Sequence, residues 1–352
     1  MGKQIKIKEI AALAGVSAGT VDRVLHNRGK VSEKSLAAVQ RVLSEVDYKF
    51  NINTSAVSFR KEFNILAAMP SFSKGEYWES LYVGIQDALE EYSDINMHCR
   101  LECYDQFDSA SCRYVFDRAL EGPPFDAVII GPTFENETME FCHELESRDI
   151  PYVFVDSAID RLNPWASFSA DQFSCGQILA RVMIPFLGPE GRLVLLESHR
   201  SGNQLSQNSI DRIKGFRSYM EERVLLHRLL EDEFYPMDPE RNRGQIEKIL
   251  AAHPDVRGFA VLNSRGYAVA EALESLGRRD IHLVCFDLTS RNRTALEKCR
   301  IDILLCQRPH EQGFEAVKSL LSYVLYNQKD AEPHHLMPID IIVKENLPYY
   351  RQ

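Results

Sequence analysis

The stretch from Ile7 to Asn27, IKEIAALAGVSAGTVDRVLHN, constrains this chain more than any other part of it. Apolar residues at three- and four-residue spacing predict a short helix with one apolar stripe, made by Ile7, Ile10, Leu13 and Ala14. Gly15 is a typical helix stop, and Ser17 fits the N-cap of a second helix. The inward positions of that second helix are Val21, Val24 and Leu25. Two short helices joined by a turn that contains glycine are typical of a helix-turn-helix, which lays its second helix in a DNA groove.

The outward face of the second helix carries the residues that could contact DNA, which are Ala18, Gly19, Asp22 and Arg23. We predict a base contact for Arg23, because a guanidinium pairs with O6 and N7 of guanine in the major groove. Ser17 and Thr20 suit phosphate oxygens. Asp22 either accepts from N4 of cytosine or braces Arg23, and bracing is favoured because a carboxylate near phosphates is costly.

A third helix should begin at Ser32, with the acidic Glu33 in its first turn. Its expected buried stripe is Leu36, Val39, Leu43 and Val46. Three such helices suffice for a small DNA-binding head. The alternative is an ordinary helical hairpin inside a larger fold.

Charge favours the DNA interpretation. Residues 1–62 hold 11 Lys and Arg against 6 Asp and Glu, whereas residues 63–352 hold 30 against 45. A basic head can neutralise phosphates and release counterions, while an acidic body is repelled by DNA. Overall acidity alone would have argued against a nucleic-acid partner.

The run from Ile5 to Asn51 resembles the N-terminal signature of the lactose-repressor (LacI/GalR) family of bacterial transcriptional regulators. The matching motifs are AGVSAGTVDRVL, the following VSE, and the Tyr-x-x-Asn from Tyr48 to Asn51. Later landmarks extend the resemblance over nearly the whole chain. It implies a homodimer in which each head reads a half-site of double-stranded operator DNA.

The resemblance also implies a hinge helix on the minor groove, with Val57 as an apolar wedge between base pairs. Phe50 stands where the family usually has Pro, and Val57 stands where it usually has the longer Leu, so the kink in the DNA should be smaller. A linker that is disordered off DNA is the alternative. The full set of expected DNA contacts is Ser17, Ala18, Gly19, Thr20, Asp22, Arg23, Asn27 and Val57.

The length of 352 residues leaves room for two lobes behind the head. Short apolar runs alternate with helical stretches, which predicts parallel sheets covered on both faces. The expected strands are 64–69, 99–104, 127–131, 152–155, 192–197, 258–263, 282–286 and 302–306, followed by a last strand and tail in the run IDIIVKENLPYY at 339–350. The resemblance implies the two-lobed, periplasmic-binding-protein-like (type I) α/β fold, with crossovers near Asp171 and near residue 290. The expected units are a head at 1–50, a hinge linker at 51–62, and an effector and dimerisation domain at 63–352, with lobes 63–170 plus 290–325 and 171–289 plus 326–352.

Polar residues follow several of these strands, where ligands of such sheets bind. Four such residues are Asp156, Asn263, Asp287 and Gln307, and Arg212 opens a helix three residues before Gly215. Residue by residue, these five match positions where the family contacts its effector. Three aromatic residues fall where the family stacks rings on the ligand: Tyr77, Trp78 and Phe168. Carboxylates, amides and a guanidinium suit the vicinal hydroxyls of a sugar. Asp171 is either a helix-opening acid near the cleft or the N-cap of the helix through Gly176.

The sequence therefore predicts a cytoplasmic, homodimeric, allosteric DNA-binding regulator with a small-molecule, sugar-like effector. An α/β enzyme or a solute-binding protein of the same fold, acting on a sugar or nucleoside-like ligand, is the alternative. The enzyme is disfavoured, because GxGxxG after a strand, GxSxG and GxxxxGK[ST] are lacking, and we assign neither catalytic residues nor a cofactor. Eight scattered cysteines and the histidines show no metal-ligand spacing, and no apolar run is long enough to span a membrane.

Overall fold

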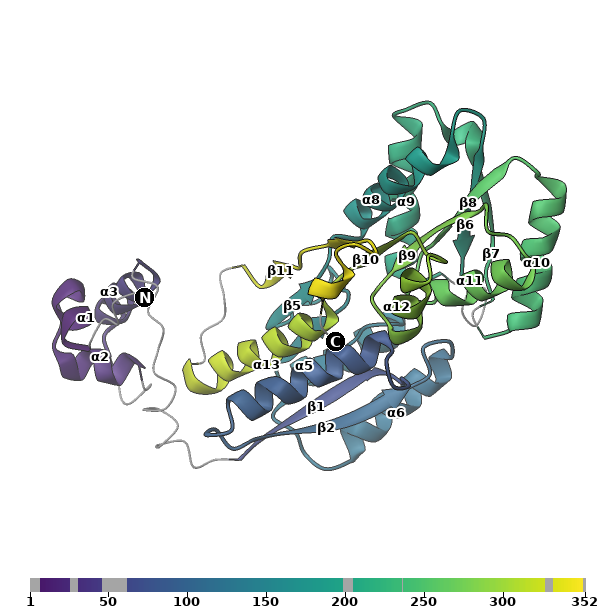
Figure 1. Cartoon of the computed structure of the whole chain (residues 1–352). Coiled ribbons are helices and arrows are strands. Elements are labelled where there is room, and N and C mark those ends of the chain that lie inside the picture. The colour runs from purple at the N-terminus through teal and green to yellow at the C-terminus, as the bar shows by residue number, and fades with distance from the viewer. Residues whose placement is uncertain are drawn as a thin grey trace.

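The computed structural model describes residues 7–25, 31–45, 62–198, 205–235, 237–326 and 332–350. It contains a small helical head and a body of two α/β lobes (Figure 1). The predictions for Asn27, Val46, Val57 and the hinge linker up to residue 61 lie outside the described residues. Within the described ranges, every helix is too short or too polar to cross a membrane.

The head consists of α1 (Ile7–Ala14), α2 (Ala18–Leu25) and α3 (Glu33–Glu45). As predicted, α1 stops at Gly15, which has φ 65°, and the Thr20 N–H donates to Ser17 Oγ at 3.0 Å. The small core holds Ile10, Ala11, Val21, Val39 and Val42.

Two leucines that we expected in this core lie at the surface. Leu13 is 58% exposed and Leu36 is 37% exposed, so their assignment to the buried stripes is wrong. Each helix turns about 100° per residue, which places Leu13 on the flank of the stripe centred between Ile10 and Ala14. Val42 is buried in α3 instead.

The first lobe, which we call the N-lobe, is built on a six-stranded sheet of order β11-β5-β4-β3-β1-β2 whose neighbours all pair in parallel. Its elements are β1 (Phe63–Pro70), α5 (Tyr77–Glu91), β2 (Met97–Tyr104), α6 (Ser109–Glu121), β3 (Ala127–Ile130), α7 (Glu135–Ser147), β4 (Tyr152–Val155), β5 (Ala166–Ser169), α13 (Pro309–Tyr326) and β11 (His334–Leu336).

The second lobe, the C-lobe, repeats this order as β12-β10-β9-β8-β6-β7, with β12 antiparallel to β10. Its elements are α8 (Gln172–Met183), β6 (Arg192–Glu197), α9 (Gln207–Glu221), β7 (Leu229–Glu233), α10 (Pro239–Ala252), β8 (Val256–Val261), α11 (Gly266–Ser275), β9 (His282–Phe286), α12 (Ser290–Glu297), β10 (Ile303–Cys306) and β12 (Asp340–Ile342). Short 3-10 turns lie at Ile184–Leu187, Leu226–Arg228 and Leu347–Tyr349.

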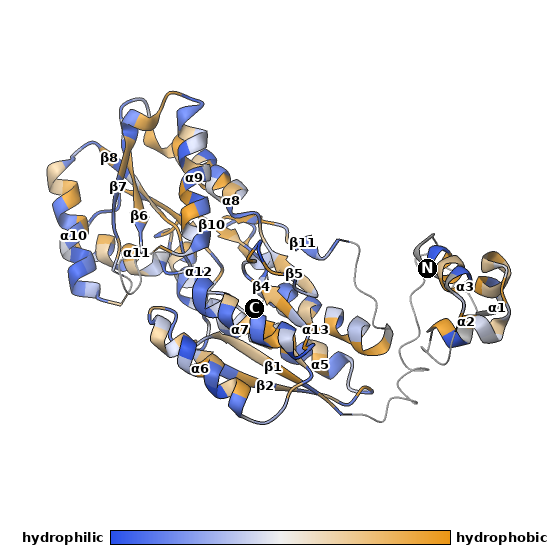
Figure 2. Ribbon diagram, turned by 180° about the vertical axis from the view of Figure 1, so that it is seen from behind, coloured by the Kyte–Doolittle hydropathy of each residue, from blue (hydrophilic) through white to orange (hydrophobic). Residues whose placement is uncertain are grey.

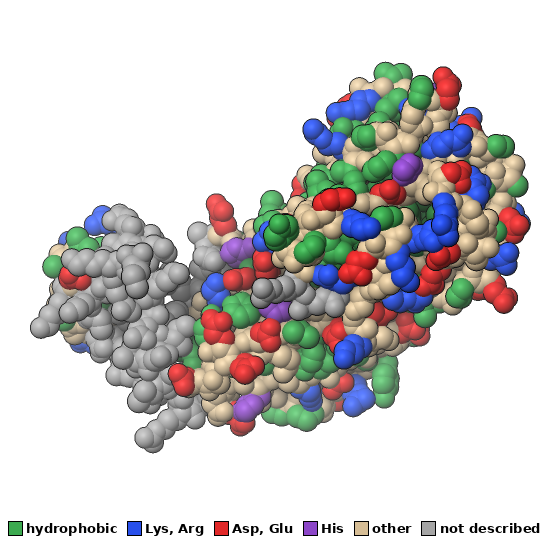
Figure 3. All heavy atoms as spheres, viewed as in Figure 1, with side chains coloured by type: hydrophobic (Ala, Val, Ile, Leu, Met, Phe, Trp, Pro, Cys, Tyr) green, Lys and Arg blue, Asp and Glu red, His purple; other side chains and the backbone are tan. Residues whose placement is uncertain are grey.

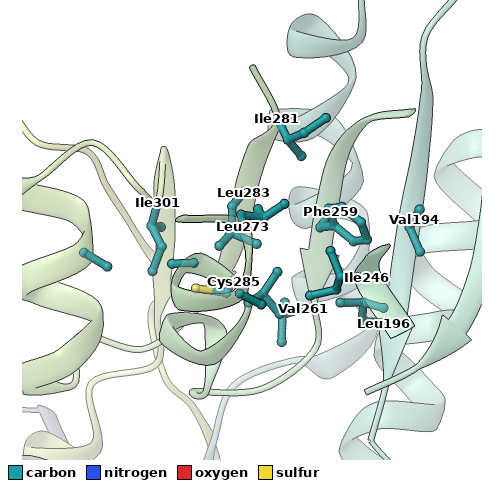
Figure 4. Packing of buried hydrophobic residues seen from close by; sticks show 14 of the residues in the cluster. Val194, Leu196, Ile246, Phe259, Val261, Leu273, Ile281, Leu283, Cys285 and Ile301 are labelled. Carbon is teal, nitrogen blue, oxygen red and sulfur yellow. The ribbon is translucent and has the colours of Figure 1, made fainter. Parts of the chain in front are cut away.

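Each sheet is covered by helices on both faces, as the near-continuous apolar strands predict. Figure 2 shows α6 and α10 with a hydrophobic side and a hydrophilic side. On one face of the C-lobe sheet, Phe259 and Leu283 meet Ile246 of α10 and Leu273 of α11 (Figure 4). On the visible face of the body, acidic and basic side chains are interspersed (Figure 3).

The lobe boundaries differ from the predicted ones. The first crossover falls near Asp171, as expected, but α12 and β10 belong to the C-lobe, so a second crossover near residue 290 is wrong. The chain returns to the N-lobe only after Cys306 and crosses a third time between β11 and β12. Residue 290 precedes β10, and β10 still pairs with β9 in the C-lobe sheet. The chain has therefore not yet left the C-lobe at residue 290.

Close packing holds α8 against α9 within the C-lobe. On α8 and α9, Gly176 and Gly215 face the partner backbone: an added Cβ would lie 2.8 Å from the carbonyl carbon of Arg212 and of Phe173, respectively. Only glycine permits this approach. It brings the start of α8 against the turn of α9 that carries Arg212.

Candidate functional site

The structure brings four of the five predicted polar residues together where the lobes meet. Asp156 follows β4 of the N-lobe, Asp287 follows β9 of the C-lobe, and Gln307 follows β10 at the crossover. Arg212 reaches them from the second turn of α9. Both aspartates have positive φ, 70° for Asp156 and 63° for Asp287, so the two lobes end their equivalent strands in the same way.

Arg212 is the centre of this polar cluster and is 5% exposed. Its guanidinium donates to Gln307 Oε1 at 2.9 Å, to Gln172 Oε1 at 2.7 Å and to the Leu262 carbonyl at 2.5 Å. It also lies over the Phe286 ring, 3.9 Å from the centroid. These partners hold a buried cation in one orientation, and its positive charge acts on Asp287.

Asp287 is 4% exposed, and Gln307 Nε2 lies 3.3 Å from both of its carboxylate oxygens. Burial raises the pKa of Asp287 from its ordinary value of 3.8 to about 7, while Arg212 and Gln307 act in the opposite direction. A carboxyl group that is half protonated near neutral pH can both accept and donate a hydrogen bond.

Asp156 links the two lobes. Its carboxylate accepts from Asn208 Nδ2 of α9 at 3.0 Å, and its backbone N–H donates to Gln312 Oε1 of α13 at 2.7 Å. Gln312 Nε2 also lies 3.4 Å from the Tyr77 hydroxyl. Burial, Asp156 and Asp287 raise the pKa of Tyr77, so its hydroxyl stays a hydrogen-bond donor.

The other predicted site residues lie around this cluster. Trp78 and Phe168 are buried in the N-lobe core, Trp78 edge-on to Tyr77 with centroids 5.2 Å apart and Phe168 stacked on His335 at 4.7 Å. Asn263 is partly buried, and its Oδ1 accepts from the Arg265 N–H in the turn before α11. Asp171 caps α8, accepting from the N–H groups of Phe173 and Ser174.

Sequence reasoning missed three members of the cluster, Gln172, Asn208 and Gln312. A signal existed for Asn208, which precedes Arg212 by four residues and so shares its helix face. Gln172 and Gln312 lie on crossover helices, and only the packing of α8 on α9 and of α13 on α5 brings them to the strand ends.

The raised pKa of Asp287 predicts a pH-dependent stability. Between about pH 4 and pH 7 the folded protein keeps a proton that the unfolded chain releases, so this group's contribution to stability is lost as pH rises and is fully lost above pH 7. Asp287→Asn should therefore raise the free energy of unfolding at pH 8 by about 2 to 4 kcal/mol, at roughly 1.4 kcal/mol per pKa unit, and the gain should vanish at pH 4. Urea unfolding at pH 4, 6 and 8 measures it, with the exposed Asp160→Asn as control. An equal gain at all three values would contradict it.

The two lobes also touch outside the polar cluster. The Ser290 N–H at the start of α12 donates to the Gly75 carbonyl of the N-lobe at 2.8 Å. The guanidinium of Arg265 in the C-lobe lies 5.4 Å from the ring centroid of Phe107 in the N-lobe. We call this arrangement, with the lobes in contact, the closed one.

On the head, α2 presents an exposed face. Ser17, Ala18, Gly19 and Arg23 are exposed and Thr20 is partly buried. The Ser17 and Thr20 hydroxyls are 2.9 Å apart, and Arg23 Nε donates to the Gly19 carbonyl at 3.0 Å. The Asp22 side chain, like Asn27 and Val57, lies outside the described set.

Comparison with known proteins matches both parts of the chain. The bacterial regulatory proteins, lacI family, match residues 6–51, and the periplasmic binding protein domain matches residues 66–328. The HTH-type transcriptional regulator DegA of Bacillus subtilis is 26% identical over 61% of this chain, and the match covers 60% of the length of DegA. A ribose operon repressor of Halalkalibacterium halodurans is 24% identical over 80% of each chain.

Among solved structures, a protein described as a LacI transcriptional regulator from Bacteroides fragilis superposes with a TM-score of 0.77. It is 29% identical and covers 83% of this chain and 100% of its own. A solute-binding protein from Burkholderia graminis in complex with D-arabinose is 16% identical, with a TM-score of 0.71 over 83% of this chain and 99% of its own, and shares the fold. With its helix-turn-helix head and its two-lobed periplasmic binding protein domain, the chain belongs to the lacI family of bacterial regulatory proteins.

Proposed function

We propose that this chain is a cytoplasmic, homodimeric, sequence-specific DNA-binding transcriptional regulator, controlled by a sugar-like small molecule bound between its lobes. One observation carries the proposal: a single chain joins an exposed recognition helix to a polar cluster contributed by both lobes. Because Asn208 and Asp156 belong to different lobes, a ligand that bonds both favours the closed arrangement. Closure then alters how the heads meet DNA.

The chemistry of the cluster supports a sugar. Asp156, Asp287 and Gln307 offer acceptors, and Arg212, Asn208 and Tyr77 offer donors. Vicinal hydroxyls use donors and acceptors side by side, as this set provides. Relatives named as ribose operon repressors agree with this class of effector.

The proposal is tested by operator binding with and without sugars. The full chain should prefer a fragment of its own promoter over random duplex at physiological salt, and an effector should change that affinity roughly 5- to 150-fold. A solute-binding protein would bind sugar with no preference among duplexes. An enzyme would turn its ligand over, which chromatography of the recovered sugar would reveal, and we expect the sugar unchanged.

Arg23→Ala should weaken binding to the specific operator by about 1 to 3 kcal/mol and relax the preference at one base pair. The reason is that the exposed guanidinium can leave the Gly19 carbonyl for a base edge. Lys34→Ala removes the same charge from an exposed position on α3 and should weaken all duplexes equally. Quantitative gel-shift titrations measure both, and an unchanged base preference for the Arg23 variant would remove this residue from base readout.

A further inference from the structure

A cavity opens beside the polar cluster. It has a volume of about 640 Å³ and is lined by the loops after β3 and β4 of the N-lobe and by the first turns of α9 of the C-lobe. We call it the outer pocket. Its lining residues are 132–137, 157–161, Leu205, Gln207, Ile210 and Asp211. Its size lies within the range of roughly 300 to 1,000 Å³ that holds small-molecule ligands.

Residues that line the outer pocket are direct sequence neighbours of residues in the polar cluster, in both lobes. On α9, Asn208 and Arg212 are four residues apart and belong to the cluster, whereas Gln207 and Asp211, one position earlier, line the outer pocket. In the N-lobe, Asp156 belongs to the cluster and the next residue, Ser157, lines the pocket. A ligand that is hydrogen-bonded by Asp156 and Asn208 would therefore lie next to the outer pocket.

The walls of the pocket are held in place by hydrogen bonds. Ser157 Oγ donates to the Pro132 carbonyl at 3.2 Å, joining the two N-lobe loops, and the Tyr104 hydroxyl is 2.9 Å from Thr133 Oγ1. Phe134 and Ile159 are buried and line it with apolar surface. The apolar surface suits the C–H face of a sugar ring, and the Pro132 carbonyl and the Thr133 hydroxyl, which are held in place, suit its hydroxyls.

The charges of the lining disfavour anions. Among the described residues, four carboxylates line the pocket, from Glu135, Glu137, Asp160 and Asp211, against one guanidinium, that of Arg161. Two of these carboxylates form ion pairs with residues outside the lining: Glu137 lies 3.3 Å from Arg113, and Asp211 lies 3.0 Å from Lys214. A phosphate or carboxylate group placed here would face like charges.

We propose that the effector is an uncharged glycoside of at least two units, with one sugar ring in the polar cluster and the second unit in the outer pocket. This inference rests on the proposed function. It adds the size and the charge of the effector. Because both lobes line the outer pocket, the second unit contacts both of them, and a longer ligand stabilises the closed arrangement more than a single sugar does.

Isothermal titration of the full chain tests it with matched pairs, glucose with cellobiose and maltose, and galactose with lactose and melibiose, and with glucuronate and glucose 6-phosphate as anionic probes. We expect a disaccharide to bind at least tenfold more tightly than its own monosaccharide, and the anionic probes to bind more weakly than glucose. Ile210→Trp fills the outer pocket and should abolish the disaccharide's advantage while monosaccharide affinity remains. Glu221→Trp, at the exposed end of the same helix, is the matched control and should keep the advantage.

Equal affinities within every pair, a tighter anionic probe, or an Ile210→Trp variant that keeps the full advantage would each overturn the two-unit effector and leave the regulator intact. A full chain that binds none of these sugars would overturn both this inference and the sugar-controlled regulator. Retained monosaccharide binding by Ile210→Trp shows that the variant is folded.

Discussion

Gly75→Ala is expected to hold the lobes apart and to lower effector affinity by about 10- to 100-fold. Gly75 has φ 81°, and an added Cβ would lie 2.6 Å from Ser290 Cβ, at the point where the lobes hydrogen-bond. The overlap exists only when the lobes are closed, so the variant depopulates the closed state, and apparent affinity falls with that population. Titration calorimetry measures the loss, and small-angle scattering with saturating effector measures the lobe separation.

Two further variants separate overlap from backbone strain. Gly277 has φ 69° with nothing near its missing Cβ, so Gly277→Ala should cost about 1 to 2 kcal/mol of stability from strain alone and leave effector affinity unchanged. Adding Ser290→Gly to Gly75→Ala removes the clashing side chain and should restore most of the affinity. If the double variant stays as weak as Gly75→Ala, overlap with Ser290 is not the cause.

Arg212→Met is expected to destabilise the body by about 3 to 5 kcal/mol and to abolish the effector response. The substitution leaves the buried acceptors on Gln172 and Leu262 without the guanidinium that donates to them, and Gln307 Oε1 keeps only its bond from Gln172. It also takes away the positive charge that opposes the raised pKa of Asp287. Urea unfolding measures the stability, and operator binding with and without effector measures the response.

The control for this substitution lies on the same helix. Arg217 pairs with Glu231 at the surface, where its side chain is 54% exposed, so Arg217→Met should change stability by less than about 1 kcal/mol and leave the response intact. Because Arg212→Met weakens folding, Arg212→Lys provides a second variant that keeps the charge but loses the forked geometry. A normal effector response in both Arg212 variants would place the effector elsewhere.

The elements with strong periodicity or long apolar runs were predictable. The helices of the head and the eight apolar strands follow from the local spacing of apolar residues, because burial of one helix face or of a whole strand requires that spacing. Three strands were missed, namely β5, β7 and β11, whereas β12 falls within the last strand and tail expected at 339–350. They are short or polar: β7 reads LLEDE and β5 reads ASFS, and each holds its place through its neighbours in the sheet.

The membership of the polar cluster could be predicted only in part. Asp156, Asp287 and Gln307 were recognisable because each directly follows a strand, and Arg212 came from the family resemblance. Asn263 matched the same rule, yet its side chain bonds to the turn before α11. The end of a strand determines where the backbone of the next residue lies, but the local turn determines the direction of its side chain.

By itself the sequence determined the class of the molecule: a basic helical head, a two-lobed α/β body, and polar residues at strand ends. These follow from local patterns of charge and burial, which act within a few residues of chain. Only the tertiary structure decided which strand ends meet, that Gln172, Asn208 and Gln312 join them, and that the chain changes lobe after Cys306 instead of near residue 290. Those contacts join residues far apart in the chain, as with Asp156 and Gln312, and depend on glycine-mediated packing between helices that no local pattern specifies.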